Sequence, residues 1–300
     1  MFWIMAFIFT AIPVGLIMAG IYYLNEHERQ PLWMLGLSFG GGFLTFALVR
    51  LTSNLLNGRV YELSSDSPFL THNWEFFLIA FGLIAVVEEL SKFIIANVLT
   101  FRSRKFQIPY GGIAYAVFVS LGFAFIENFK YLYEQGLGIA ISRAIFTIPA
   151  HAAFGVVMGY FLGLAKSCKI NGLNQEALKM RYTAFFFPLL LHGMYDYICN
   201  FNIPQAYYIL IGYSIVIYAL SFFLLHKFNN LDFQIYQKDV YKKDDIMMDY
   251  DDDISIQKEK IQKRLFMTHE QGDWNVDNQN VQQKNISMKM FAEDDEESNN

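Results

Sequence analysis

Long apolar stretches separated by short polar segments follow one another along the first three-quarters of the chain. Each is long enough for a helix that crosses a bilayer, which needs about 20 residues. So many apolar helices in series cannot all be buried inside one soluble domain of this length. The sequence therefore predicts an all-α, polytopic transmembrane helix bundle of about seven helices. The expected helices cover residues 2–24, 33–51, 74–100, 113–133, 141–168, 184–201 and 207–225.

Composition agrees with this pattern, since 54% of the residues are hydrophobic and only 17% are charged. The first apolar stretch does not resemble a cleaved signal peptide. Residues 1–24 contain no Lys or Arg and form one long apolar run, whereas a signal peptide has a positive start and a short apolar core. We therefore expect this stretch to be a retained transmembrane helix.

The basic residues of the loops predict the orientation of the bundle, because Lys and Arg are enriched in cytoplasmic loops. Eight of them fall on the side of the first, third and fifth loops, and four fall on the other side. The sequence thus predicts an N-terminus outside the cell and a C-terminus in the cytoplasm. The first set is Arg29, Arg102, Arg104, Lys105, Lys166, Lys169, Lys179 and Arg181; the second is Arg50, Arg59, Lys130 and Arg143.

The composition changes abruptly after His226, where 17 Asp and Glu stand against 10 Lys and Arg. Acidic runs such as "DYDDD" and "EDDEESNN" are typical of a solvated, disordered segment. We therefore divide the chain into a transmembrane domain, 1–226, and an acidic cytoplasmic tail, 227–300. An acidic tail has the wrong sign for nucleic acid, so we expect no nucleic-acid partner.

Ionisable residues inside four consecutive apolar helices carry the functional information. Each costs about 2.5–3.5 kcal/mol at the bilayer centre on insertion scales, so such groups usually face the bundle interior and find partners. Counted along their helices, they fall between the middle and the outer half of the membrane. They are Glu88, Glu89 and Lys92 in the third helix, Glu127 in the fourth (followed by the polar but uncharged Asn128), His151 in the fifth, and His192 and Asp196 in the sixth.

Each residue taken alone also has a structural interpretation. Glu88 and Lys92 are four apart and can form an ion pair, which leaves Glu89 in need of another partner. His151 alone is more often a hydrogen-bonded core histidine than a catalyst, and Glu127 alone could be interfacial. The glycines that follow His151 at four-residue spacing favour close helix packing. The coincidence of so many polar groups on adjacent helices favours a functional cluster.

The residue types suit hydrolysis. Two carboxylates in a low-dielectric site resist carrying two charges, so one can hold a proton near neutrality and act as general base and acid. A nearby histidine can donate a hydrogen bond to an oxyanion. The same groups could bind Zn²⁺ through His151, His192 and either Glu89 or Asp196. The zinc-protease signature H-E-x-x-H is missing, which favours a site without a cofactor.

Four motifs in order resemble those of the PrsW family of intramembrane proteases, which is related to the CAAX prenyl protease and Abi superfamily. They are "EELSK", "GFAFIEN", "HAAFG" and "HGMYD", and the resemblance covers about residues 74–200. It implies a bacterial cytoplasmic-membrane endopeptidase whose substrate is a membrane-anchored protein. The type example is implicated in cleaving an anti-sigma factor.

The resemblance also implies roles for individual residues. Glu88 and Glu89 match the paired catalytic glutamates, with Glu88 expected to activate water. His192 and Asp196 match the H-x-x-x-N motif that is thought to stabilise the oxyanion. Lys92 comes one residue sooner than the Arg of the wider superfamily, and Glu127 stands where that superfamily has a histidine. The resemblance leaves open whether Glu127 or His151 assists the base, and whether a metal takes part.

Two other functions compete with the protease. Carboxylates and histidines near the midplane could relay protons in a proton-coupled transporter, although the paired helix interruptions of many transporters are not evident. A catalytically inactive membrane scaffold is the other alternative. Lys92 and Asn128 are expected to support the catalytic residues, and the sequence predicts no oligomeric state.

Overall fold

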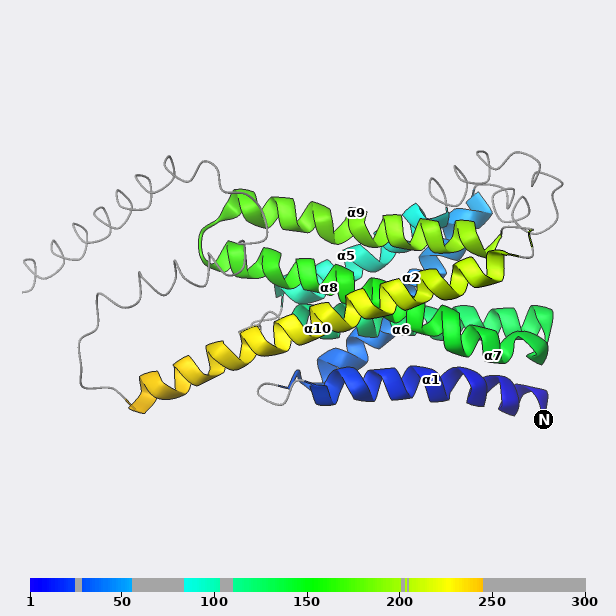
Figure 1. Ribbon diagram of the computed structural model, residues 1–300, viewed down its shortest axis with the longest axis horizontal. Helices are drawn as coiled ribbons and strands as arrows, with labels where there is room; N and C mark the ends of the chain where they lie inside the picture. Colours follow the sequence, from blue (N-terminus) through cyan, green and yellow to red (C-terminus); the bar gives the residue numbers. More distant parts are fainter. Residues whose placement is uncertain (25–28, 56–83, 103–109, 201–202, 204, 245–300) are drawn as a thin grey trace, which may run out of the picture. The chain divides into compact units, whose positions relative to one another are not determined.

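The computed structural model describes residues 1–24, 29–55, 84–102, 110–200, 203 and 205–244. Within these residues the secondary structure is helical, without strands, and Met1–Tyr241 form one compact unit (Figure 1). The described part contains seven long helices, as predicted. They are α1 (Phe2–Leu24), α2 (Leu32–Leu55), α5 (Val86–Arg102), α6 (Tyr110–Gln135), α8 (Ile148–Ile170), α9 (Asn174–Cys199) and α10 (Ala206–Asp244).

Several boundaries differ from the prediction. The expected third helix began at residue 74, but residues 74–83 lie outside the described residues. The backbone of α10 continues past His226 to Asp244, so helix extends into the segment predicted as a tail. The other tail residues, 245–300, lie outside the described residues. The predicted orientation of the bundle stays a prediction.

The expected fifth helix, 141–168, is not one regular α-helix in the structure. A 3₁₀ turn η3 (Leu137–Ile139), a short α7 (Ala140–Ser142) and a π-helical turn η4 (Arg143–Thr147) lead directly into α8. Gly136 separates them from α6 and has a φ of 82°, a conformation that glycine adopts at little cost. A π turn contains an extra residue compared with an α turn. It therefore changes which side chains face the bundle interior before α8 begins.

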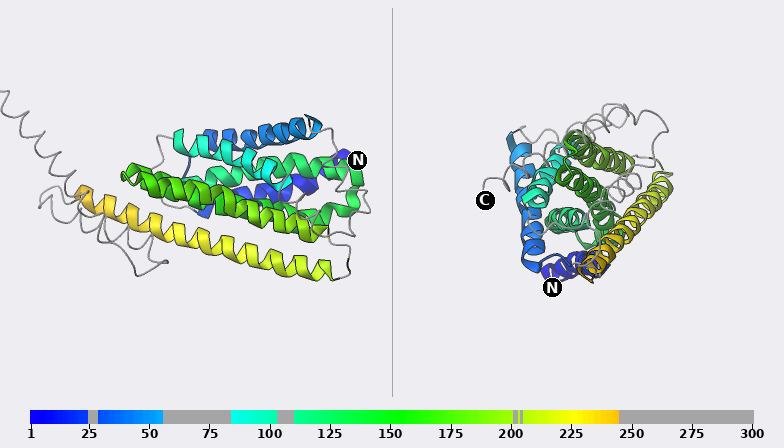
Figure 2. Two further views of the ribbon diagram at one scale, coloured as in Figure 1. Left: turned by 90° about the horizontal axis from the view of Figure 1, so that it is seen from above. Right: turned by 90° about the vertical axis from the view of Figure 1, so that its left-hand side faces the viewer.

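Helices α6 and α8 form the centre of the bundle. Most of their residues are buried, whereas α1 and α10 expose many large apolar side chains such as Leu16 and Phe222. The end-on view of Figure 2 shows the other long helices arranged around these two. The hydrophobic exterior is what a bilayer would cover. Among the described residues, five spans are long and apolar enough to cross a membrane: Phe2–Leu24, Leu32–Thr52, Tyr110–Gln135, Leu137–Ile170 and Ala206–Phe228.

Glycines allow α6 and α8 to approach closely. A methyl group on Gly159 would meet the backbone carbonyl of Gly112 at 2.5 Å, and one on Gly112 would meet the Gly163 nitrogen at 2.8 Å. A methyl group on Gly155 would meet the Val117 Cα atom at 2.9 Å. The predicted packing role of the α8 glycines is confirmed. This close contact fixes the position of α8 against α6, and both helices carry ionisable residues of the site.

Candidate active site

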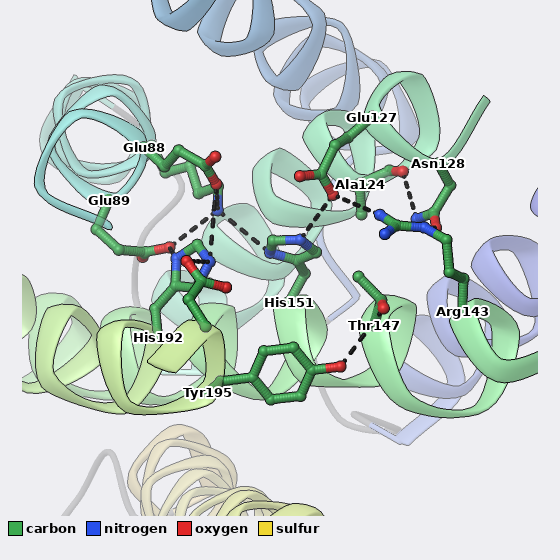
Figure 3. Close-up of polar contacts among 12 residues, drawn as sticks. Glu88, Glu89, Ala124, Glu127, Asn128, Arg143, Thr147, His151, His192 and Tyr195 are labelled. Carbon is green, nitrogen blue, oxygen red and sulfur yellow. Dashed lines mark hydrogen bonds and ion pairs between the residues drawn. The ribbon is translucent and has the colours of Figure 1, made fainter. Parts of the chain in front are cut away.

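The first turns of α5 bring three charged side chains into the bundle interior. Two of them, Glu88 and Glu89, are labelled in Figure 3. Glu88, Glu89 and Lys92 have side chains that are 5%, 0% and 1% exposed. The Lys92 ammonium lies 2.9 Å from Glu89 Oε1 and 3.7 Å from Glu88 Oε2. Lys92 therefore pairs more closely with Glu89 than with Glu88, the partner expected from the sequence. Residues three and four positions before Lys92 both lie on its side of the helix, so the sequence spacing allows either pair. The contacts with neighbouring helices decide between Glu89 and Glu88.

His192 of α9 is the second partner of Glu89. Its Nδ1 atom lies 2.8 Å from Glu89 Oε1, a contact between residues 103 positions apart in the chain. On the other side of the ring, Nε2 is 3.4 Å from Asp196 Oδ2 and 3.8 Å from Glu88 Oε2. The imidazole also stacks on the Phe154 ring, with centroids 5.0 Å apart. Its orientation is thus fixed by packing as well as by hydrogen bonds.

His151 of α8 joins the α5 residues to α6. Its Nδ1 atom lies 3.3 Å from the Lys92 ammonium, and its Nε2 atom lies 3.1 Å from Glu127 Oε2. An ammonium only donates hydrogen bonds and a carboxylate only accepts them. His151 can satisfy both neighbours only with its proton on Nε2. Glu127 and His151 were alternative assistants of the base in the sequence, and in the structure they form one hydrogen-bonded pair.

Arg143 belongs to the site, although the sequence indicated only a loop charge. It lies in η4, where its Nη2 atom is 3.0 Å from Glu127 Oε2 and its Nε atom is 2.5 Å from Asn128 Oδ1. Asn128 in turn donates to the Ala124 carbonyl oxygen at 2.7 Å. No pattern in the sequence predicts a π turn here. The only available signal was a cation close before the fifth-helix histidine.

Two carboxylate oxygens in the site are buried without a hydrogen-bond partner among the described residues. They are Glu88 Oε2 and Glu89 Oε2. An unsatisfied buried acceptor costs roughly 1–3 kcal/mol, and more when it is charged. A buried group left without a hydrogen-bond partner calls for an explanation, and a catalytic role is one. These oxygens are suitably placed to accept hydrogen bonds from a water molecule or a substrate.

The metal ligands considered from the sequence do not form a metal site as they are arranged. Both ring nitrogens of His151 are engaged, one by Glu127 and the other by the Lys92 ammonium. That ammonium also contacts Glu88 and Glu89, so a positive charge already lies among the groups that would bind a cation. Within the described residues, no group of three His, Cys, Asp or Glu side chains could hold a metal ion.

The cluster becomes more exposed from α5 towards α6 and α9. Glu127 and Asp196 have side chains that are 14% and 22% exposed, against 0% for Glu89. Glu127 lies eight residues before Gln135, the last residue of α6, which corresponds to about 12 Å along the helix. The site therefore lies in one half of the bundle, nearer the ends of α6 and α9, and its exposed side contains Glu127 and Asp196.

Comparisons with known proteins identify the family of the chain. Residues 30–225 match the model of the PrsW family, described as intramembrane metalloproteases. The chain is 30% identical over 220 residues to "Protease PrsW" of Oceanobacillus iheyensis, which covers 73% of the chain and 94% of the relative. It is 28% identical over 242 residues to "Protease PrsW" of Clostridioides difficile, covering 79% and 97%. No solved structure gives a significant match. By this match and these relatives, the chain belongs to the PrsW family of membrane proteases.

Proposed function

We propose that this protein is an intramembrane endopeptidase that hydrolyses a peptide bond of a membrane-anchored protein with water activated by Glu88 and Glu89. The observation that carries this proposal is the pair of buried carboxylate oxygens, Glu88 Oε2 and Glu89 Oε2, that have no hydrogen-bond partner among the described residues. The matched family and relatives are proteases, which favours hydrolysis over a proton-coupled transporter.

Glu88 is our choice for the general base. Glu89 Oε1 is already within 2.9 Å of Lys92 and 2.8 Å of His192, which favours a permanently charged Glu89. The contacts of Glu88 with the same two residues are 3.7 and 3.8 Å long. Its carboxylate is therefore the less restrained of the two, and the freer to accept a proton and return it.

In the proposed reaction, Glu88 accepts one proton from a water molecule while the water oxygen bonds to the substrate carbonyl carbon. The C–N bond of the tetrahedral intermediate then breaks. The proton held by Glu88 passes to the leaving nitrogen, so one water is consumed and a new carboxyl terminus and a new amino terminus are formed. A base within hydrogen-bond reach of the water contributes about 10²–10⁴-fold to the rate.

His192 is our candidate for donating a hydrogen bond to the oxyanion. Its Nδ1–H is directed at Glu89, so donation from Nε2, which lies near Glu88 Oε2, requires the imidazolium form. Asp196 cannot take that role as a carboxylate, since it has no proton to donate. We assign it to orienting His192, at 3.4 Å from the ring. Glu127 and His151 assist as a pair, and Lys92 balances the charge of the glutamates.

We propose that the reaction proceeds without a metal, although the family description includes one. This rests on the donor set described above, in which the Lys92 ammonium occupies the space between the carboxylates and His151. The motifs alone support the wider relation to CAAX prenyl proteases. They are also the basis for a substrate of the anti-sigma-factor type in a bacterial cytoplasmic membrane.

The proposed mechanism is tested by removing the carboxylates one at a time. Glu88→Gln and Glu89→Gln keep the side-chain shape, and we expect either to lower cleavage of single-pass membrane peptides by roughly 10²–10⁴-fold. Glu134→Gln is the matched control, because Glu134 is 47% exposed and pairs with Lys130 on the surface of α6. Wild-type cleavage by both single variants would refute the mechanism.

We further propose that the loop between α8 and α9 is cytoplasmic and that the end of α6 faces outside, as the loop charges predict. Single cysteines at exposed Gln135 and Asn171, in a background lacking Cys168 and Cys199, test this orientation with an impermeant thiol reagent on intact cells. We expect labelling at residue 135 only. Labelling at residue 171 instead would place the site in the cytoplasmic half of the membrane.

A further inference from the structure

Arg143 is held on three sides by residues of α6. Its guanidinium donates to Glu127 at 3.0 Å and to Asn128 at 2.5 Å, and its central carbon lies 4.0 Å from the centre of the Tyr131 ring. A guanidinium is a planar, permanently charged fork, so this arrangement fixes both its position and its plane. The side chain is only 17% exposed. So many directed contacts on one arginine indicate a precise position rather than a surface charge.

The π turn is what brings Arg143 to this position. In a regular α-helix, a shift of one residue turns a side chain by about 100°. The π-helical Arg143–Thr147 segment contains the extra residue, and α8 resumes at Ile148 with His151 facing the same Glu127 oxygen. π turns are frequent at functional sites. Here the turn lets Arg143 and His151 contact a single carboxylate oxygen from two points along one helical segment.

A continuous chain of charged hydrogen bonds runs inward from Arg143. Arg143 and His151 both lie within 3.1 Å of Glu127 Oε2, and the far side of the His151 ring faces Lys92. Lys92 in turn lies 2.9 Å from Glu89. The proton on His151 Nε2 is required by Glu127, and the lone pair on Nδ1 is required by Lys92. Each side chain in this series therefore determines which atom of its neighbour donates a hydrogen bond and which accepts one.

We propose that Arg143 is a positioning residue of the active site. It keeps Glu127 charged and aimed at His151 Nε2, which leaves the Nδ1 lone pair to hold Lys92 close to Glu89. Glu88 then keeps a free oxygen for water. This inference rests on the proposed function, in which Glu88 is the base. It assigns a role to a residue outside all four motifs, carried by a π turn rather than by a regular helix.

The first test is a direct measurement of the His151 proton. Nitrogen-15 labelling of histidine in the purified full-length protein reports which ring nitrogen carries the proton, and His151→Gln identifies the signal. We expect the Nε2–H form in the wild type and a mixture of forms in Arg143→Gln. Lys130→Gln is the matched control, because this partly exposed cation of α6 pairs with Glu134 rather than with Glu127. An unchanged His151 signal in Arg143→Gln would overturn the proposal.

The second test is a double-mutant cycle on peptide cleavage. Misplacement of a catalytic group by about 1 Å costs up to roughly 10²-fold, so we expect Arg143→Gln to lower kcat by about 10- to 100-fold with little change in KM. Arg143→Lys keeps the charge without the fork and should recover part of this loss. In a Glu127→Gln background, Arg143→Gln should add nothing. Independent, multiplying losses would overturn the proposal.

The two proposals fail separately. Full activity of Glu88→Gln would refute the base but would leave the His151 proton measurement to decide the role of Arg143. If Arg143→Gln does not accumulate in the membrane, Arg143→Lys carries both measurements, because it preserves a cation beside Glu127. A wild-type His151 signal and wild-type kcat in each of these two variants that accumulates would show that Arg143 positions nothing.

Discussion

Two ionic clusters lie side by side in the bundle and differ in how completely their buried polar atoms are hydrogen-bonded. The carboxylate cluster, Glu88, Glu89, Lys92 and His192, is almost completely buried yet contains two carboxylate oxygens without hydrogen-bond partners among the described residues. The arginine cluster, Glu127, Asn128, Arg143 and His151, is somewhat more exposed. Its Glu127 carboxylate receives both Arg143 and His151, and its Asn128 amide is bonded at both ends.

The difference separates two tasks of charged groups in an apolar bundle. The arginine cluster has no buried side-chain polar atom without a partner among the described residues, which suits it to orient its neighbours. An unsaturated cluster costs stability and keeps acceptors ready for a proton. Lys92 connects the two, since it contacts both glutamates of the first cluster and His151 of the second.

Removing that connection should have the largest effect on stability. Lys92→Met keeps the length of the side chain but leaves buried carboxylates without their cation, which costs about 3–5 kcal/mol for a buried pair. We expect the free energy of unfolding to fall by roughly that amount, measured by detergent-denaturant titration of the purified protein. Lys130→Met, at a partly exposed position, should change it by less than about 0.5 kcal/mol. If the two variants had equal free energies of unfolding, Lys92 would not be the counter-charge of the buried carboxylates.

The smallest effect is expected from metal removal, and it sharpens the view of the carboxylate cluster as one organised around Lys92. Elemental analysis of active protein should find far less than one zinc ion per chain, and prolonged chelation should leave cleavage unchanged. Stoichiometric zinc that disappears in His192→Gln would contradict this expectation. It would mean that the Lys92 ammonium moves away and that the free oxygens of Glu88 and Glu89 are ligands.

Much of the fold could be predicted because the length and the apolar composition of a transmembrane helix can be recognised in the sequence. The interior of the site could be predicted for a related reason: Glu88, Glu89, His151 and His192 are costly in apolar helices, and such a cost implies neighbours. The identity of those neighbours could not be predicted. Glu89 meets His192 because α5 and α9 are adjacent and in one particular rotation, which depends on packing across the whole bundle.

Arg143 marks the limit of sequence reasoning more sharply. Basic residues in loops predict the orientation of the bundle in the membrane, and in the sequence Arg143 was counted among them. Its real position depends on a π turn, which has no recognisable sequence signature in "RAIFT". The choice between Glu127 and His151 could not be made from the sequence for a similar reason, since the two residues work as a pair only when α6 and α8 are in contact through their glycines.

The long sequence separation within the site also bears on how the protein is made. Chains are synthesised from the N-terminus, and earlier segments fold first. When α5 is inserted, Glu89 already has Lys92 one turn away, so the helix carries part of its own neutralisation. His192 arrives only with α9, 103 residues later than Glu89. In the proposed mechanism, a nascent chain therefore has the glutamates but lacks His192, and we expect it to leave other membrane proteins at the insertion site uncleaved until α9 is in place.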